Sequence, residues 1–347
     1  MKLRNLKTIF IYIGIFCFTQ SLNAQYSSKK IKTKHESYTD SLKNVEYNYV
    51  FPIWGQKAYK KGFDIPYPVG AMANFLWMKQ GVTINELQLG VKSNTLDVPL
   101  TDVDFIQFGD NENTTYTVNI RPDIWVFPFL NVYAILGYGN SKTEVNLIAP
   151  LQVKSIVEQN VSTFGIGMMV AGGVGPVWIS ADFNTTWNKP ELLDEAVRVV
   201  VAGVRLGHTF VFNNKPERNL AFWAGAMYAK MDSKTEGQIT LSEALPSEVW
   251  DRKDAFVQDY YDWYDNEATI PQKAVADRVL TPIVERIDAV DGSAIVRYGM
   301  NKQVKQNWNG IIGAQYQFNK RWMVRTEAGI VGDRKSILAS VNYRFLL

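Results

Sequence analysis

The sequence has very little cysteine and histidine, with one Cys and two His among 347 residues. The single cysteine, Cys17, lies in an N-terminal segment that we expect to be removed, which leaves no disulfide, thiolate nucleophile or cysteine metal site. A phosphate-binding glycine loop, a zinc motif and a dinucleotide fingerprint are also missing. No later segment contains about eighteen consecutive apolar residues, which excludes a transmembrane helix. We therefore predict no cofactor and no metal site.

The N-terminal segment has the three parts of a secretory signal. Three basic residues precede an apolar run over 8–18 and a small-residue cleavage site that ends at Ala24. Residues 1–24 are therefore predicted to be cleaved. Phe16 precedes Cys17, whereas a lipoprotein signal has a small residue there, so we expect no lipid anchor. Removing the signal takes the net charge from +3 to 0, and a balanced chain gives no electrostatic reason to expect nucleic acid as a partner.

The C-terminal residues 336–347 alternate between apolar and polar side chains, with Leu338 and Leu346 as exceptions. A period of two places the two sets on opposite faces of a strand. The apolar face ends in Tyr343, Phe345 and Leu347. A strand of this kind at the end of an exported chain is typical of the closing strand of an outer-membrane β-barrel.

Other segments of strand length have the same alternation or are rich in aromatic residues. The twelve predicted strands are 45–53, 69–79, 83–93, 114–127, 130–145, 160–172, 174–187, 196–212, 219–234, 304–318, 320–331 and 335–347. An even number fits a closed barrel with both termini in the periplasm. We therefore predict an all-β fold, a transmembrane antiparallel β-barrel of about twelve strands over 45–347, in the outer membrane of a Gram-negative bacterium. A secreted soluble β-protein is the alternative.

The links between these strands alternate in length. Short links at 79–81, 128–130, 172–173 and 318–320 are predicted to be periplasmic turns. Long links, on the opposite and extracellular rim, are predicted at 94–113, 146–159, 188–195 and 235–303. Before the barrel, the lysine-rich residues 25–44 contain few apolar side chains, so we expect a disordered periplasmic tail.

The link at 235–303 contains two helical patterns. A helix capped by Ser247 would begin at Glu248, and a second would cover roughly 272–287 with a kink at Pro282. The apolar face of the first helix consists of Val249, Phe256, Tyr260, Trp263 and Tyr264. These faces must bury against each other, in the barrel mouth or against a partner, which predicts a helical insertion that is extracellular or occludes the mouth.

The most distinctive stretch is R-x-D-x-W-x-x-P-F-L-N-x-Y, which covers 121–133. It resembles a strand–turn–strand of a poorly characterised family of Gram-negative, Bacteroidetes-like outer-membrane β-barrels, and the close resemblance extends little beyond this hairpin. The resemblance implies a barrel fold. From their spacing, Arg121 and Asp123 share a face and could pair inside. The alternative is a hairpin adapted to the membrane by an aromatic girdle.

Nine charged residues from different strands are predicted to point into the lumen. They are Glu86, Lys92, Arg121, Asp123, Asp182, Arg205, Arg325, Glu327 and Arg344. They could form a constriction that selects permeating solutes by charge. Because the five positive and four negative groups nearly balance, they could instead pair with one another and fill the lumen. Both interpretations predict the same residues and opposite conductances.

Two further groups have the chemistry of a site but a simpler explanation. The acidic residues Asp259, Asp262, Asp265 and Glu267 could bind a divalent cation, but helical spacing would spread them over a solvated face. His208 is predicted near the periplasmic end of its strand, whereas a lipid-modifying enzyme would need a serine and a histidine at the extracellular rim. We therefore predict no catalytic residue and no enzyme.

The predicted function is a channel or transporter for small solutes, which diffuse passively through the charged lumen. The alternative is a structural or surface-interaction barrel that does not conduct and uses 235–303 to bind a partner. A lipid-modifying outer-membrane enzyme is a distant third hypothesis. The expected partners are outer-membrane lipid, the barrel-assembly machinery and a small solute that the sequence does not identify.

Overall fold

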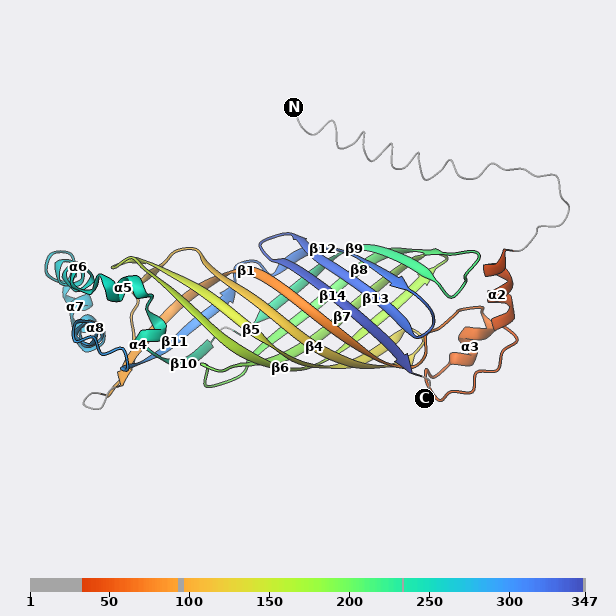
Figure 1. Cartoon of the computed structure of the whole chain (residues 1–347), viewed down its shortest axis with the longest axis horizontal. Helices are drawn as coiled ribbons and strands as arrows, with labels where there is room; N and C mark the ends of the chain where they lie inside the picture. Colours follow the sequence, from red (N-terminus) through yellow and green to blue (C-terminus); the bar gives the residue numbers. More distant parts are fainter. Residues whose placement is uncertain (1–32, 93–96, 233, 346–347) are drawn as a thin grey trace, which may run out of the picture.

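Ten antiparallel strands close into a barrel in the computed structural model, which describes residues 33–92, 97–232 and 234–345 (Figure 1). The ring closes because β1 pairs with β4 on one edge and with β14 on the other. The ten strands are β1 (Val69–Lys92), β4 (Asn111–Phe127), β5 (Leu130–Ala149), β6 (Val153–Val174), β7 (Val177–Pro190), β8 (Val197–Val211), β9 (Asn219–Met231), β12 (Trp308–Gln317), β13 (Trp322–Val331) and β14 (Lys335–Phe345).

The predicted number of twelve strands was wrong in two places. Residues 45–53 form no strand and lead instead into the short helix α3 (Gly55–Lys60). The predicted strands 69–79 and 83–93 are one continuous strand, β1, so the turn predicted at 79–81 does not exist. The remaining nine predicted strands each correspond to a strand of the ring, with boundaries that differ by several residues.

Gly81 lies where β1 changes one of its two partners. On its N-terminal side, β1 pairs with β14 as far as Lys79. On its C-terminal side, β1 pairs with β11 (Ile295–Val304) from Val82 onward. The Gly81 N–H donates to Asp333 Oδ2 at 2.6 Å. A Cβ atom at Gly81 would lie within 3.0 Å of the Asp333 carboxylate and the Lys305 side chain, so the glycine permits a close approach between strands and does not form a turn.

Four further strands extend the barrel at the end away from the C-terminus. β11 and β2 (Asp97–Asp102) pair with the upper half of β1, β10 (Lys234–Thr240) pairs with β11, and β3 (Gln107–Phe108) pairs with β5. The sequence analysis missed all four because they lie inside links that were predicted to be loops. The link predicted at 146–159 is also mostly strand, since β5 continues to Ala149 and β6 begins at Val153.

Five helices cover this end of the barrel and form what we call the cap (Figure 1). They are α4 (Leu241–Ala244), α5 (Ser247–Asp251), α6 (Lys253–Asn266), α7 (Ile270–Arg278) and α8 (Leu280–Asp288). Tyr260 and Trp263 of α6 are buried against α7 and α8. In the described ranges, no helix has both the length and the apolar composition needed to cross a membrane.

The helix boundaries in the cap differ from those predicted. The residue at the N-cap of α5 is Pro246 and not Ser247. The second predicted helix, over 272–287, is divided into α7 and α8 at Val279 and not at Pro282. Pro282 lies in the first turn of α8, where a missing N–H costs no helical hydrogen bond.

At the other end, the described part of the predicted disordered tail 25–44, which is residues 33–44, contains a helix. Residues 34–42 form helix α2 (Lys34–Leu42), whose capping box joins Thr33 and Glu36. Leu42 packs with Ala58, Tyr59 and Ile65 in a small core. Isolated helices of this length are marginal, so this packing explains the order. The predicted signal at 1–24 lies outside the described residues.

The outer surface of the ring is apolar and its inner surface contains the polar residues, as the alternation predicted. On β14, Ile337 and Val341 are half exposed, whereas Ser340 and Asn342 are buried. Leu347 lies outside the described residues. Large exposed apolar side chains continue around the ring on the outward faces of β4, β5, β6, β7 and β8. A closed antiparallel ring with an apolar exterior is the architecture of an outer-membrane β-barrel of Gram-negative bacteria.

Candidate functional site

Glu327 is the centre of a cluster of paired charges inside the ring, which we call the plug (Arg205, Asp182, Arg325 and Glu327). The Glu327 carboxylate accepts from Arg205 Nε at 2.7 Å and Nη2 at 2.9 Å, and from Arg325 Nη2 at 2.9 Å. Trp223 Nε1 also donates to it at 2.8 Å. Arg205 in turn pairs with Asp182. Every carboxylate of the plug therefore has a cationic partner.

The strand pattern brings the plug together from four parts of the sequence. Asp182 is on β7, Arg205 on β8 and Trp223 on β9, and the i, i+2 spacing of Arg325 and Glu327 gives them the same face of β13. The Arg325 guanidinium lies 4.6 Å from the centre of the Trp223 ring. Arg205 and Glu327 are less than one-tenth exposed. These charged groups are therefore paired with one another inside the ring.

A second ion pair lies nearer the C-terminal end of the barrel. Arg344 Nη1 donates to Asp123 Oδ1 at 2.9 Å, and Asn131 donates to the same oxygen at 2.6 Å. Arg121 does not pair with Asp123, although the shared face suggested it. Its guanidinium lies 4.2 Å from the centre of the Tyr133 ring instead.

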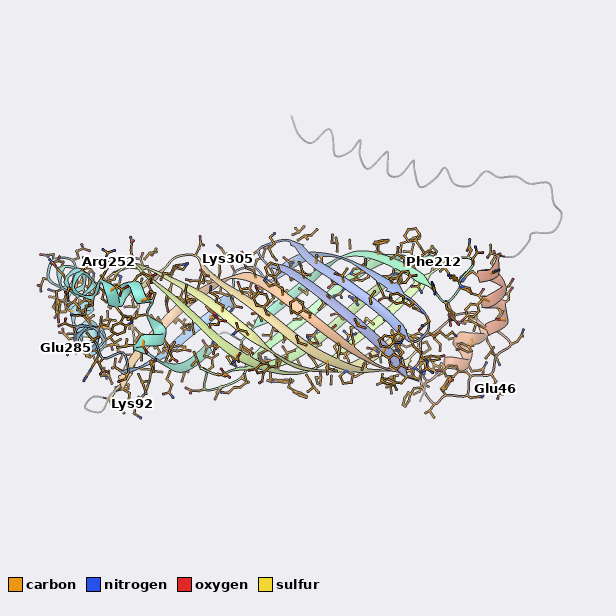
Figure 2. The ribbon with its side chains drawn as sticks, in the orientation of Figure 1. Glu46, Lys92, Phe212, Arg252, Glu285 and Lys305 are labelled. Atoms are coloured by element: carbon orange, nitrogen blue, oxygen red, sulfur yellow. The ribbon has the colours of Figure 1, made fainter. Side chains whose placement is uncertain are left out.

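Glu86 and Lys92 do not line the ring, which corrects two of the nine predicted positions. Both are exposed on the upper half of β1, and Figure 2 shows Lys92 at the end of the molecule that holds Arg252 and Glu285 of the cap. The cause is a β-bulge: the register with β11 shifts between Asn85 and Gln88, where Glu86 has a φ of 53°. A bulge adds a residue and interrupts the alternation of faces, which the sequence pattern did not reveal.

Above the plug lies a chamber of about 700 Å³. Its floor includes Arg205, Arg325 and Glu327, and its roof is formed by apolar side chains of the cap, among them Leu241, Phe256, Tyr260, Ile283 and Ile287. Its side walls are mostly apolar. They include Met72, Leu76, Met78, Val82, Ile84, Val145, Leu147, Val157, Val199 and Met231.

The sequence analysis predicted a polar lumen and so missed the chamber. The sequence of β1 contained an indication of the apolar chamber. Its inward positions Met72, Leu76 and Met78 are apolar, and its outward positions Phe75 and Trp77 are apolar as well. A strand that is apolar on both faces of a membrane barrel cannot face water on its inner side without cost. That pattern therefore indicates an apolar interior.

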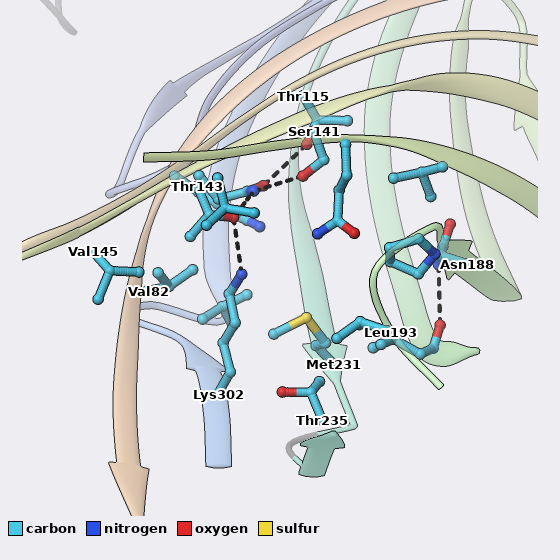
Figure 3. A pocket seen from close by; sticks show the side chains of 18 of the residues that line it. Val82, Thr115, Ser141, Thr143, Val145, Asn188, Leu193, Met231, Thr235 and Lys302 are labelled. Carbon is cyan, nitrogen blue, oxygen red and sulfur yellow. Dashed lines mark hydrogen bonds between the residues drawn. The ribbon is translucent and has the colours of Figure 1, made fainter. Parts of the chain in front are cut away.

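A group of polar side chains interrupts the mostly apolar wall of the chamber around Lys302 (Figure 3). Lys302, on β11, points across the chamber and donates from Nζ to Thr143 Oγ1 at 3.2 Å. Asn113 Nδ2 donates to the same hydroxyl at 2.9 Å and to Ser141 Oγ at 2.8 Å. In the described part of the chain, no carboxylate lies within ion-pair distance of Lys302.

The other sequence candidates contribute to neither the plug nor the chamber. His208 lies beside the turn between β6 and β7, opposite Val177, with its ring 4.4 Å from that of Phe210. The acidic residues Asp259, Asp262, Asp265 and Glu267 are on or directly after α6. No three His, Cys, Asp or Glu side chains converge on a metal position within residues 33–92, 97–232 and 234–345.

No protein-family model matches the chain, and no curated protein matches its sequence. Among solved structures, the β-domain of the Bordetella autotransporter BrkA is 12% identical with a TM-score of 0.34, over 80% of this chain and all of that one. An outer membrane channel from Pseudomonas putida F1 is 10% identical with a TM-score of 0.28, over 81% and 97%. Omp33 from Acinetobacter baumannii is 9% identical with a TM-score of 0.22, over 81% and 99%. Similarity of this degree identifies no function for the chain.

Proposed function

We propose that this barrel takes a small, largely apolar molecule into the chamber beneath the cap, as a step in its passage across the outer membrane. The observation that carries the proposal is the chamber itself, a mostly apolar volume of about 700 Å³ inside the barrel. Sites for small molecules are typically concave, mostly apolar and about 300–1,000 Å³ in size. An apolar ligand would replace solvent that apolar walls bind poorly.

The plug argues against free diffusion of charged solutes through an open lumen. A selectivity filter needs charged groups that face a water path, whereas Arg205 and Glu327 are buried and bonded to each other. We propose that the plug is the inner barrier that a molecule in the chamber has to pass. This replaces the predicted charged constriction with a chamber that has the plug at one end and the cap at the other.

The surface-interaction hypothesis has less support. It requires an apolar face of α6 that is free to bind a partner, but Tyr260 and Trp263 are almost fully buried. They pack with Ala276 and Val284 of the neighbouring helices and with Phe105 and Leu151. The apolar faces of the cap thus cover one another and the barrel mouth. The function that we propose is not enzymatic.

A binding measurement tests the chamber directly. Equilibrium dialysis of the barrel, held in an amphipathic polymer in place of detergent, against radiolabelled decan-1-ol should show one saturable site per chain. Val145 points into the chamber (Figure 3), so Val145→Trp should fill part of it and weaken binding at least tenfold. Ile148 lies on the outward face of the same strand, so Ile148→Trp is the matched control and should bind like the unsubstituted protein.

Two outcomes would overturn the proposal. One is the absence of saturable binding to the folded, unsubstituted barrel. The other is equal binding to the Val145→Trp and Ile148→Trp variants, because the bound alcohol would then lie outside the chamber. Retention of the compact barrel in each variant is checked by its faster migration on electrophoresis before heating.

A further inference from the structure

Lys302 is an ammonium group in an apolar chamber without a carboxylate to neutralise it. Its chamber neighbours include Val82, Val145 and Met231 (Figure 3). Among the described residues, Lys302 makes one hydrogen bond, to the Thr143 hydroxyl, although an ammonium group has three N–H donors. Lys302 is partly buried, and withdrawing a charge from water without a counter-ion costs free energy. A negative group that comes from outside the chain would offset this cost.

The polar groups beside Lys302 are arranged to donate and not to accept. Thr115 Oγ1 donates to Asn113 Oδ1 at 3.0 Å, which fixes the orientation of the Asn113 amide. The amide nitrogen then donates to both Ser141 Oγ and Thr143 Oγ1. Each of these hydroxyls is an acceptor in its recorded contacts, so each keeps a proton that it can donate. An ammonium group and two hydroxyl protons at one place form a binding site for an anion.

The charges around the chamber have the same bias. Six cationic side chains line it, and only two acidic ones. The cationic residues are Arg121, Arg205, Lys230, Lys302, Arg325 and Arg334. Both acids, Asp182 and Glu327, are already paired with Arg205 in the plug. An anionic ligand would therefore meet a net attractive field.

We infer that the ligand of the chamber is an aliphatic monocarboxylate, with its carboxylate bound by Lys302, Thr143 and Ser141 and its hydrocarbon chain against the apolar walls. This inference rests on the proposed function and specifies its substrate class. An alcohol of equal chain length would fill the same apolar volume but would leave Lys302 without a counter-ion. The carboxylate thus provides the selectivity and the apolar chamber provides the volume.

Lys302 carries the positive charge that this assignment requires. It lies on β11, outside the ten-stranded ring and beyond the exposed ion pair of Lys79 and Glu112. Burial lowers the pKa of Lys302 to about 8, with no charged neighbour contributing. The group is still largely protonated at pH 7, so it can bind a carboxylate there.

The test compares four dialysis ligands of similar chain length: decanoate, decan-1-ol, decyltrimethylammonium and decane-1-sulfonate. The unsubstituted barrel should bind decanoate at least tenfold more tightly than decan-1-ol, and should bind the cation most weakly. Lys302→Met should abolish the preference for decanoate while it retains decan-1-ol binding. Lys302→Arg should keep most of the preference. The matched control is Lys154→Met, because Lys154 pairs with Glu144 on the outer surface at 2.9 Å.

The outcomes separate this inference from the proposed function. If decanoate and decan-1-ol bind the unsubstituted barrel equally, or if Lys302→Met keeps the preference, the carboxylate assignment is wrong and the chamber proposal stands. If none of the four ligands binds the folded barrel, both fail. If decane-1-sulfonate binds as tightly as decanoate, the site recognises the negative charge alone and the carboxylate class is overturned.

Discussion

The plug and the chamber occupy the same barrel interior, but the charged groups of the plug have ion-pair partners, whereas Lys302 in the chamber has none among the residues that the structure describes. In the plug, Glu327 accepts hydrogen bonds from Arg205, Arg325 and Trp223. In the chamber, Lys302 has a single hydroxyl partner and apolar neighbours. Charges that are fully paired hold a structure together, whereas a charge left without a counter-ion is costly and is kept for a use. The comparison therefore separates structural charges from a binding charge within one lumen.

The largest expected effect is on conductance. Ser242 N donates to Gly292 O at 3.0 Å, so residues 243–291 can be replaced by a short turn without separating the ends. In a planar bilayer, the unsubstituted protein, this cap-less variant and Glu327→Ala should each give no resolvable current, because at least one barrier remains in each. The cap-less Glu327→Ala variant should give discrete current steps. Steady current through the cap-less variant alone would show that the plug is not a barrier.

Glu327→Ala should also cause the largest loss of stability. It leaves Arg205 and Arg325 buried without their shared carboxylate, and breaking a buried pair typically costs about 3–5 kcal/mol. Urea unfolding in lipid vesicles, followed by tryptophan fluorescence, measures this loss. Glu112→Ala is the control, because the ion pair with Lys79 is exposed at 2.7 Å and should contribute about 0–1 kcal/mol. Equal losses in the two variants would mean that the plug does not stabilise the barrel.

Asp333→Ala should have an intermediate effect. Asp333 accepts from the Gly81 N–H at the point where β1 changes partner, and leaving a buried donor unsatisfied costs about 1–3 kcal/mol. The same unfolding measurement should give a loss in this range. Asp333→Asn keeps an acceptor oxygen and should recover most of it. A loss as large as that of Glu327→Ala would indicate that this junction, and not the plug, limits stability.

Lys302→Met should raise the free energy of unfolding of the barrel at neutral pH. The folded pKa of about 8 lies below the ordinary value of 10.5, so folding disfavours the charged form. The charged form of Lys302 therefore destabilises the folded state by its full amount below pH 8. This destabilisation decreases as the pH rises from 8 and is gone above 10.5. The advantage of the methionine variant, measured by urea unfolding at several pH values, should therefore shrink over that interval. A loss of stability at pH 7 would show that Lys302 has a structural role.

Local alternation was sufficient to predict the wall of the barrel. Ile337 and Val341 were expected outside and Ser340 and Asn342 inside, because a period of two fixes the face once the strand is recognised. Five of the nine expected lumen residues line the chamber, namely Arg121, Asp182, Arg205, Arg325 and Glu327, and Asp123 and Arg344 are buried and paired with each other. The remaining two, Glu86 and Lys92, failed because a bulge interrupts the alternation. A bulge of this kind depends on the register with the neighbouring strand, which the sequence of one strand does not contain.

The chamber could not be predicted in the same way, since it depends on contacts between distant segments. β1 and β11 are far apart in the sequence, and their pairing, which sets Ile84 opposite Lys302, brings Lys302 beside Thr143 of β5. Charge pairing is also set by three-dimensional distance: Asp123 pairs with Arg344, 221 residues away, and not with its neighbour Arg121. The apolar inner face of β1 was the one local indication of the chamber.

The change of partner along β1 also has a consequence for how the seam of the barrel closes. Val69–Lys79 of β1 pairs with β14, while Val82–Lys92 pairs with β11. The first and last strands of the ring therefore meet along only half of β1. The other half of β1 is paired with β11, which precedes β12, β13 and β14 in the chain. The seam of the barrel is thus shared by two strands, and its outer part is formed without β14.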